Sequence, residues 1–176
     1  MEQIILAGFG GQGILSMGKF IAYAGLEEEK NVSWLPSYGP EMRGGTANCN
    51  VIVAEEEVGS PIIGKASVLI VMNQPSLEKF EDAVEEGGIV ILDSSLVPVM
   101  PKRKDLRVFA IPATTMAYEL GNATFAGIIL LGKLLGETKV VTEENFEKAL
   151  TKILPPKKHG LIPAEMKALA MGRDYK

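Results

Sequence analysis

The sequence predicts an α/β fold in which three layers (α/β/α) are built around a mostly parallel, Rossmann-like sheet. Short, wholly apolar runs recur along the chain, as is typical of strands buried on both faces, and stretches with helical periodicity separate them. The chain has 176 residues, a length that suits one hydrophobic core. We therefore expect a single domain over residues 1–176, in which a C-terminal helix follows a linker at 155–162.

Four elements are expected in the first third of the chain. Residues 3–8 form an apolar run that ends in glycine, which predicts a buried parallel strand. Apolar residues at helical spacing follow Gly13 and predict a helix that ends in the acidic run 27–29. Residues 32–36 predict a short second strand. Residues 47–53 alternate between the two faces, which predicts a strand nearer an edge of the sheet.

The middle of the chain repeats this alternation of strands and helices. Residues 68–72 and 88–92 are apolar runs that predict strands, with a helix over about 76–85 between them. Residues 107–111 predict a further strand. Residues 123–135 are apolar on nearly every side, so we expect a helix buried all round.

Two more helices are expected near the end of the chain. Thr142 is placed to cap an amphipathic helix over 143–153. Pro155 and Pro156 open the linker, and residues 163–171 predict a short last helix with proline in its first turn.

Composition and charge exclude several classes of partner. Hydrophobic residues make up 47% and charged residues 23% of the chain, as in a packed globular protein. Eighteen Lys and Arg residues against 22 Asp and Glu give a net charge of −4, which argues against nucleic-acid and anionic membrane surfaces as partners. No apolar run approaches the ~18 residues that a membrane span needs, and the first residues lack a basic leader. We expect a cytoplasmic protein.

A glycine-rich segment joins the first strand to the first helix. The segment reads Gly8-Phe9-Gly10-Gly11-Gln12-Gly13 and matches the pattern G-x-G-x-x-G. It stands directly after a predicted buried strand and directly before a predicted helix, as this pattern does in dinucleotide-binding folds. The glycines permit a tight turn, and the free N–H groups at the start of the helix favour an anion. Gly8, Gly10, Gly11, Gln12 and Gly13 are therefore the candidate cofactor-binding residues. The alternative is that the glycines only let the helix pack closely on the sheet.

Two common nucleotide sites lack their key residues here. A phosphate-binding P-loop requires Lys and Ser or Thr after Gly13, whereas Ile14 and Leu15 stand there. An NAD site requires an acidic residue at the end of the second strand, and residues 32–36 contain none. A stand-alone Rossmann-type dehydrogenase and a nucleotide-sensing module remain as alternative functions.

A second loop, rich in glycine and proline, follows the second strand. Its position at the carboxyl end of that strand is where ligands and partners gather in such sheets. The plain alternative is a crossover loop whose charged residues are solvated or pair with each other. The candidate interface or site residues in this loop are Ser37, Tyr38, Gly39, Pro40, Glu41, Arg43, Gly44 and Gly45.

The chain holds few of the side chains that perform catalysis. Its one cysteine, Cys49, lies in an apolar stripe and is expected to be inert. Its one histidine, His159, is expected to be a solvated loop residue. A single cysteine cannot hold an iron–sulfur cluster alone, so we assign no catalytic residue and no metal ligand to this chain. Several polar residues directly follow predicted strands and serve either as caps or as the lining of a crevice: Asn73, Ser76, Asp93, Ser94 and Thr114.

The two loops together resemble the gamma subunit of the 2-oxoacid:ferredoxin oxidoreductases, in the branch that acts on 2-oxoglutarate or 2-oxoisovalerate. The resemblance starts from the segments 8–13 and 37–45 and continues through Thr46-Ala47-Asn48-Cys49-Asn50-Val51. It extends to 72–76, 93–95 and the final segment 163–172, so it covers nearly the whole chain.

This resemblance implies a function that the chain performs only in a complex. Enzymes of this family oxidatively decarboxylate 2-oxoacids to acyl-CoA, with thiamine diphosphate, Mg, iron–sulfur clusters and coenzyme A. The resemblance implies alpha and beta subunits that hold thiamine diphosphate, a ferredoxin-like delta subunit that holds clusters, and ferredoxin as electron acceptor. The gamma chain would then be an accessory subunit, inactive alone, that holds none of these cofactors by itself. Amides at Gly10, Gly11 and Gly13 are candidate contacts for coenzyme A.

Overall fold

The computed structural model describes residues 1–37 and 46–176 and contains a six-stranded sheet with the order β2-β3-β1-β4-β5-β6. The neighbours β1, β4, β5 and β6 are parallel, whereas β3 is antiparallel to both β1 and β2. The predicted mostly parallel α/β sheet is thus confirmed. The strands are β1 (Glu2–Phe9), β2 (Asn31–Pro36), β3 (Thr46–Ala54), β4 (Ala66–Val71), β5 (Val84–Asp93) and β6 (Arg107–Ile111).

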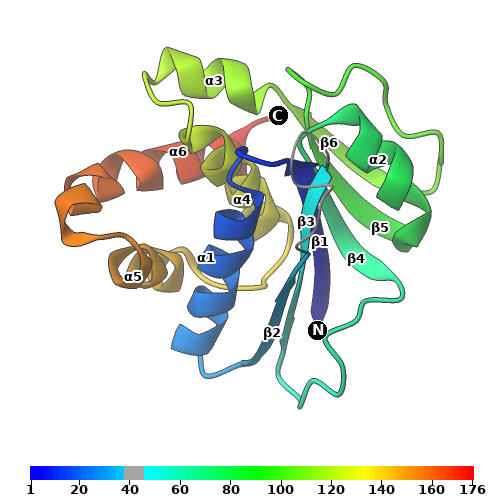
Figure 1. Cartoon of the computed structure of the whole chain (residues 1–176), viewed down its shortest axis with the longest axis horizontal. Coiled ribbons are helices and arrows are strands. Elements are labelled where there is room, and N and C mark those ends of the chain that lie inside the picture. The colour runs from blue at the N-terminus through cyan, green and yellow to red at the C-terminus, as the bar shows by residue number, and fades with distance from the viewer. Residues whose placement is uncertain (38–45) are drawn as a thin grey trace.

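Helices cover both faces of this sheet, with most of them on one face. Figure 1 shows α1, α4, α5 and α6 on one side of the sheet and α2 on the other. Two separate apolar clusters, one on each face, form the core. The α-helices are α1 (Ile14–Glu27), α2 (Gln74–Phe80), α3 (Ala113–Glu119), α4 (Phe125–Glu137), α5 (Glu143–Ile153) and α6 (Ile162–Asp174). Short 3₁₀ helices are η2 (Glu81–Ala83) and η3 (Pro156–Leu161).

The central strand β1 shows why its sequence is a continuous apolar run. Ile4 and Leu6 pack into the larger cluster, beneath α1 and α4, whereas Ile5 and Ala7 pack into the cluster beneath α2. Both faces of the strand are therefore covered, so neither set of alternating positions tolerates a polar residue.

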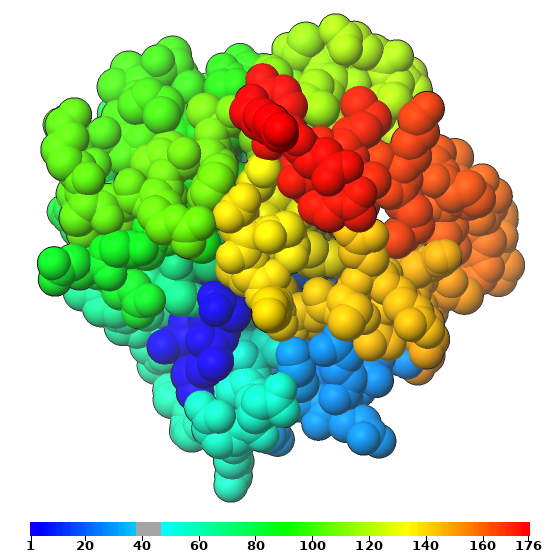
Figure 2. Space-filling view, turned by 180° about the vertical axis from the view of Figure 1, so that it is seen from behind, coloured from blue at the N-terminus to red at the C-terminus, as the bar shows by residue number. Residues whose placement is uncertain are grey.

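Helix α4 is apolar all round because other elements enclose it. A Cβ atom added at Gly132 would collide with the backbone of Leu169, and one at Gly172 would collide with the carbonyl of Ile129. The two glycines therefore allow the backbones of α4 and α6 to approach closely. The end of α6 is also tied to α4, because Lys133 Nζ donates to the carbonyl oxygens of Arg173 at 3.2 Å and Tyr175 at 2.7 Å. Figure 2 shows the C-terminal residues, in red, against the yellow surface of α4.

Some boundaries differ from the expectation. The helix expected over 76–85 ends at Phe80, and β5 already begins at Val84. The first part of β5 shows no strand pattern in the sequence, because residues 85–87 are all exposed. The pairing of β5 with β4 shifts its register in this part of the strand. The seven-residue helix α3 was not predicted, since it is short and has no side-chain cap.

The outer strands and the last helix differ in smaller ways. Strand β3 was expected nearer an edge and is second in the sheet, while β2 forms the edge. Most of the expected linker at 155–162 is the 3₁₀ helix η3, and α6 begins at Ile162. None of the helices in residues 1–37 and 46–176 combines the length and the hydropathy that a membrane span requires.

Candidate functional site

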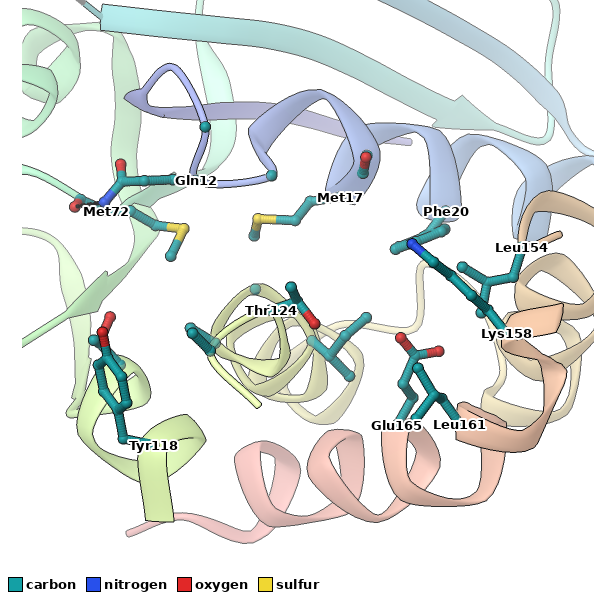
Figure 3. A pocket seen from close by; sticks show the side chains of 18 of the residues that line it. Gln12, Met17, Phe20, Met72, Tyr118, Thr124, Leu154, Lys158, Leu161 and Glu165 are labelled. Atoms are coloured by element: carbon teal, nitrogen blue, oxygen red, sulfur yellow. Dashed lines mark hydrogen bonds between the residues drawn. The ribbon is translucent and has the colours of Figure 1, made fainter. Parts of the chain in front are cut away.

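A cavity of about 560 Å³ opens at the carboxyl edge of the parallel strands, between α1, α4 and the segment that leads into α6. Figure 3 shows Gln12 of the glycine turn and Tyr118 at one end of the cavity, and Thr114 also lines it. Lys158, Leu161 and Glu165 form the other end (Figure 3). The volume lies in the range of ~300–1,000 Å³ that is usual for small-molecule sites.

The glycine turn has a backbone conformation that requires glycine. Gly11 and Gly13 have φ values of 90° and 80°, in the left-handed region that other residues rarely adopt. Gly13 is also the N-cap of α1 and offers no side-chain cap. Because the first N–H groups of a helix have no partner within the helix, the start of α1 presents free donors at this end of the cavity.

Two of the five predicted residues in this turn have structural contacts of their own. The side chain of Gln12 accepts from the Phe9 amide at 2.6 Å. It also donates to the Met72 carbonyl at 3.1 Å, and Figure 3 shows these two residues side by side. Its polar atoms are thereby engaged in holding the turn against β4. Gly8 is buried, and a Cβ there would lie 2.5 Å from Gln12 Oε1 and 2.9 Å from Ile14 Cδ1. Gly8 is thus needed for packing.

The remaining three predicted residues of the turn are accessible. Gly10, Gly11 and Gly13 are exposed. Gly11 and Gly13 line the large cavity and also a second hollow of about 310 Å³, which Gly10 and Ala47 border as well. The backbone of the turn therefore separates two hollows and is open to both. A binding role for these amides stays a prediction.

Most of the second predicted loop lies outside the described residues. This applies to Tyr38, Gly39, Pro40, Glu41, Arg43, Gly44 and Gly45, whose roles stay predictions. The flanks of the loop are described: Ser37 donates its amide to the Asn48 carbonyl at 2.8 Å, and Thr46 pairs with Phe9 in the sheet. Both flanks therefore lie at the edge that carries the glycine turn.

The topology also separates the end of β2 from the glycine turn. In a dinucleotide-binding sheet, the second strand lies beside the first and brings its acid to the ribose. Here β3 lies between β1 and β2, so the end of β2 is one strand away from the glycine turn. The arrangement does not favour the alternative of a stand-alone nicotinamide-dependent dehydrogenase.

The far end of the cavity holds a buried acid that the sequence did not reveal. Glu165 in α6 is 7% exposed, and its Oε2 atom has no hydrogen-bond partner. Burial raises the pKa of Glu165, and the positive charge of Lys158 acts in the opposite direction. A glutamate in the first turn of a helix is ordinary, so only the packing of α6 against α4 distinguishes it.

The polar residues that follow the strands act mainly as caps. Asp93 is fully buried and accepts from the Thr114 hydroxyl at 2.5 Å and the Ser95 amide at 3.0 Å. Asn73 caps α2 by accepting from the Ser76 amide at 2.8 Å. Of this set, Thr114 also lines the cavity.

Cys49 and His159 have structural surroundings. Cys49 is fully buried, and burial raises the pKa of its thiol to about 12, which agrees with an inert residue. His159 was expected to be a solvated loop residue, but it is only partly exposed, and its Nε2 lies 2.8 Å from the Leu154 carbonyl at the end of α5. Across the described part of the chain, no three His, Cys, Asp or Glu residues gather as metal ligands would.

Comparison with known proteins identifies the family. The family model for pyruvate ferredoxin/flavodoxin oxidoreductase matches residues 3–175. The chain therefore belongs to this family, and the resemblance seen in its two loops is confirmed.

Relatives and a solved structure agree with this assignment. The chain is 41% identical over 175 residues to the ketoisovalerate oxidoreductase subunit VorA of Methanothermobacter marburgensis, covering 98% of this chain and 36% of the relative. It is 35% identical over 158 residues to the 2-oxoglutarate synthase subunit KorC of Methanocaldococcus jannaschii, covering 88% of this chain and 84% of the relative. The structure of the keto/oxoacid ferredoxin oxidoreductase gamma subunit of Geobacter sulfurreducens PCA superposes with a TM-score of 0.84 at 29% identity. The superposition covers 99% of this chain and 97% of that subunit. The chain thus spans about a third of VorA but most of the other two.

Proposed function

We propose that this chain is the gamma subunit of a multi-subunit 2-oxoacid:ferredoxin oxidoreductase, which converts a 2-oxoacid and coenzyme A to acyl-CoA and CO₂ and passes electrons to ferredoxin. The family match over residues 3–175 carries the proposal. The similarity to a KorC subunit, of which the chain covers 84%, and to a gamma subunit structure, of which it covers 97%, supports the gamma role. The substrate is 2-oxoglutarate or 2-oxoisovalerate ahead of pyruvate, in line with the names of these relatives.

The donor groups of this chain do not fit the redox cofactors of such an enzyme. Iron–sulfur clusters are held by several thiolates, whereas the chain has Cys49 alone, fully buried. Mg-bound diphosphate requires clustered oxygen ligands, and residues 1–37 and 46–176 contain no group of three acids, histidines or cysteines. Following the family resemblance, we propose that alpha and beta subunits hold thiamine diphosphate and Mg and that a ferredoxin-like delta subunit holds the clusters. We also propose a cytoplasmic complex.

Coenzyme A fits the glycine turn better than these cofactors do. The exposed amides of Gly10, Gly11 and Gly13 and the uncapped start of α1 suit a phosphate group. The flanks of the 37–45 loop lie at the same edge, so we propose that this edge faces the catalytic subunits. In this arrangement the gamma subunit helps to shape the approach of coenzyme A and supplies no reacting group.

Purification of the native complex and an activity assay test the subunit assignment. The complex is purified from its native source through a tag on this chain, and 2-oxoacid-dependent reduction of ferredoxin or methyl viologen is measured with a panel of 2-oxoacids. We expect larger subunits to co-purify, coenzyme A to be required, and the isolated chain to be inactive. Turnover of a 2-oxoacid by the isolated chain would overturn the proposal.

A charge placed in the glycine turn tests the contact with coenzyme A. Gly11→Asp adds a carboxylate to the turn, and Gly11→Asn adds nearly the same volume at the same positive φ without the charge. Titration of coenzyme A into the assembled enzyme should show weaker binding for the Asp variant than for the Asn variant. Equal affinities in both variants and the wild type would remove the turn from the site. Gly59→Asp, at a position with open space around it, is the control for added charge.

A further inference from the structure

The far end of the cavity, opposite the glycine turn, holds an acid and a base that do not bind each other. Glu165, from α6, is 7% exposed, and its Oε2 has no partner. Lys158, from η3, lines the same cavity and influences Glu165 through its charge. Figure 3 shows both side chains at the end of the cavity between α1 and α6.

An unpartnered buried carboxylate points to a missing hydrogen-bond donor. Removing a carboxylate from water without a compensating bond is costly, so buried acids are normally paired. No hydrogen bond or ion pair joins Glu165 and Lys158. The cavity is therefore lined by one carboxylate with an unpartnered oxygen and by one cation that does not pair with it.

Most of the side chains around these two groups are apolar, and the hydroxyl groups of Ser16 and Thr124 also line the cavity. Met17 and Phe20 project from α1, Leu154 follows α5, and Leu161 ends η3. A ligand that suits this end combines an apolar body with one cationic donor and one anion. The cavity, about 560 Å³ in all, has room for such a molecule besides whatever occupies the glycine turn.

We propose that this end of the cavity binds an α-amino acid with an apolar side chain. The ammonium group donates to Glu165, the carboxylate accepts from Lys158, and the side chain packs against Met17, Phe20 and Leu161. The site is built from this chain alone, so the inference goes beyond the proposed function and does not depend on it.

The charge pattern selects against close analogues of an amino acid. A 2-oxoacid of the same carbon skeleton has the anion for Lys158 but no donor for Glu165, and its keto oxygen would face the carboxylate. A simple amine has the donor but leaves Lys158 without an anion. If the proposed function also holds, the ligand is the amination product of a 2-oxoacid, and the site would let that amino acid regulate the complex.

Calorimetric titration of the full chain at pH 7 tests this site. The ligands are L-valine, L-leucine and L-phenylalanine, with 4-methyl-2-oxopentanoate and isoamylamine as analogues of leucine that lack the ammonium or the carboxylate. We expect saturable binding of at least one amino acid and binding of each analogue weaker by about tenfold or more, since hydrogen bonds between charged groups are strong.

Matched variants tie the binding to the two side chains. Glu165→Gln and Lys158→Met should each weaken amino-acid binding by about tenfold or more. Glu147→Gln and Lys157→Met change the same residue types at exposed positions outside the cavity and should bind as the wild type does. Lys158 is exposed, so its substitution leaves folding intact and keeps the test decisive even where Glu165→Gln unfolds the chain.

Three outcomes would overturn the inference. The first is that none of the three amino acids binds the wild-type chain. The second is that 4-methyl-2-oxopentanoate or isoamylamine binds as tightly as leucine, because the paired charges would then be irrelevant. The third is that coenzyme A or ADP binds in place of the amino acids with a dependence on Glu165, which would assign the cavity to a nucleotide. A negative result in this titration leaves the activity assay of the purified complex unaffected, so the two proposals are tested separately.

Discussion

Replacing Gln12 with alanine removes both hydrogen bonds that hold the glycine turn against the sheet. The bond from the Phe9 amide is exposed, so water takes its place at a cost of about 0.5–1 kcal/mol. The bond to the Met72 carbonyl is partly buried, and leaving that acceptor unpaired costs about 1–2 kcal/mol. We therefore expect the free energy of unfolding to fall by about 1–3 kcal/mol in Gln12→Ala.

Urea unfolding and thermal unfolding measure this loss. In a chain of this size each kcal/mol lowers Tm by roughly 2–4 °C. Gln74→Ala is the matched control, because the Gln74 side chain accepts one exposed hydrogen bond, from the Val99 amide at 3.1 Å, and its loss should cost no more than about 1 kcal/mol. Gln12→Glu keeps an acceptor for Phe9 but turns a carboxylate toward the Met72 carbonyl, so it should be at least as unstable as Gln12→Ala.

Hydrogen exchange distinguishes a local from a general effect. Because Gln12 bridges the turn and the end of β4, amides at 9–15 should exchange faster in Gln12→Ala, while amides in α5 change little. A variant as stable as the wild type, with unchanged exchange in the turn, would refute the conclusion that this side chain holds the turn in place.

Three further predictions concern packing, the thiol and the buried acid. Gly172→Ala should lower the free energy of unfolding by about 1–3 kcal/mol because its Cβ meets the Ile129 carbonyl, whereas Gly160→Ala, in open space, should stay within about 0.5 kcal/mol in the same urea titration. Cys49 should resist a thiol reagent at pH 8 in the native chain and react fully in urea, because burial raises its pKa to about 12; rapid labelling of the native chain would contradict this. The raised pKa of Glu165 means that its carboxyl group holds a proton more tightly in the folded state than in the unfolded state. The stability that this proton contributes is therefore complete below the ordinary pKa of glutamate and is lost as pH rises through the pKa of the folded state. Glu165→Gln should therefore gain stability relative to the wild type between pH 4 and pH 7, and a constant difference would contradict the shift.

The sequence predicts those parts of the fold whose burial pattern is local. Thr142 accepts from the Asn145 amide at 3.2 Å and starts α5 where expected, because a cap and its helix are neighbours in the chain. Strand β1 was predicted from the apolar run before Gly8 for a similar reason. A strand that is covered on both faces consists almost wholly of apolar residues, so its burial can be recognised from its own sequence.

The features that were not predictable depend on contacts between distant segments. Nothing within β3 shows that it pairs with β1 as well as β2, because strand order is fixed by long-range packing. The far end of the cavity is another case. In the sequence, Glu165 is an ordinary acid in the first turn of a helix, and only the packed fold shows that it is buried. Such residues become visible only when the layers are assembled.

The position of β3 also decides what the glycine motif can do. In a dinucleotide-binding sheet, the glycines and the acid act together, because one holds the diphosphate and the other the ribose. Here β3 occupies the place beside β1 where the second strand would bring that acid, and Ala47 pairs with Gly8 instead. The turn keeps its free amides but loses the partner that would make it specific for NAD. The strand order thus leaves the glycine turn exposed, with its amides free, but without the neighbouring acid that an NAD site requires. Binding of an anion at this turn stays a prediction.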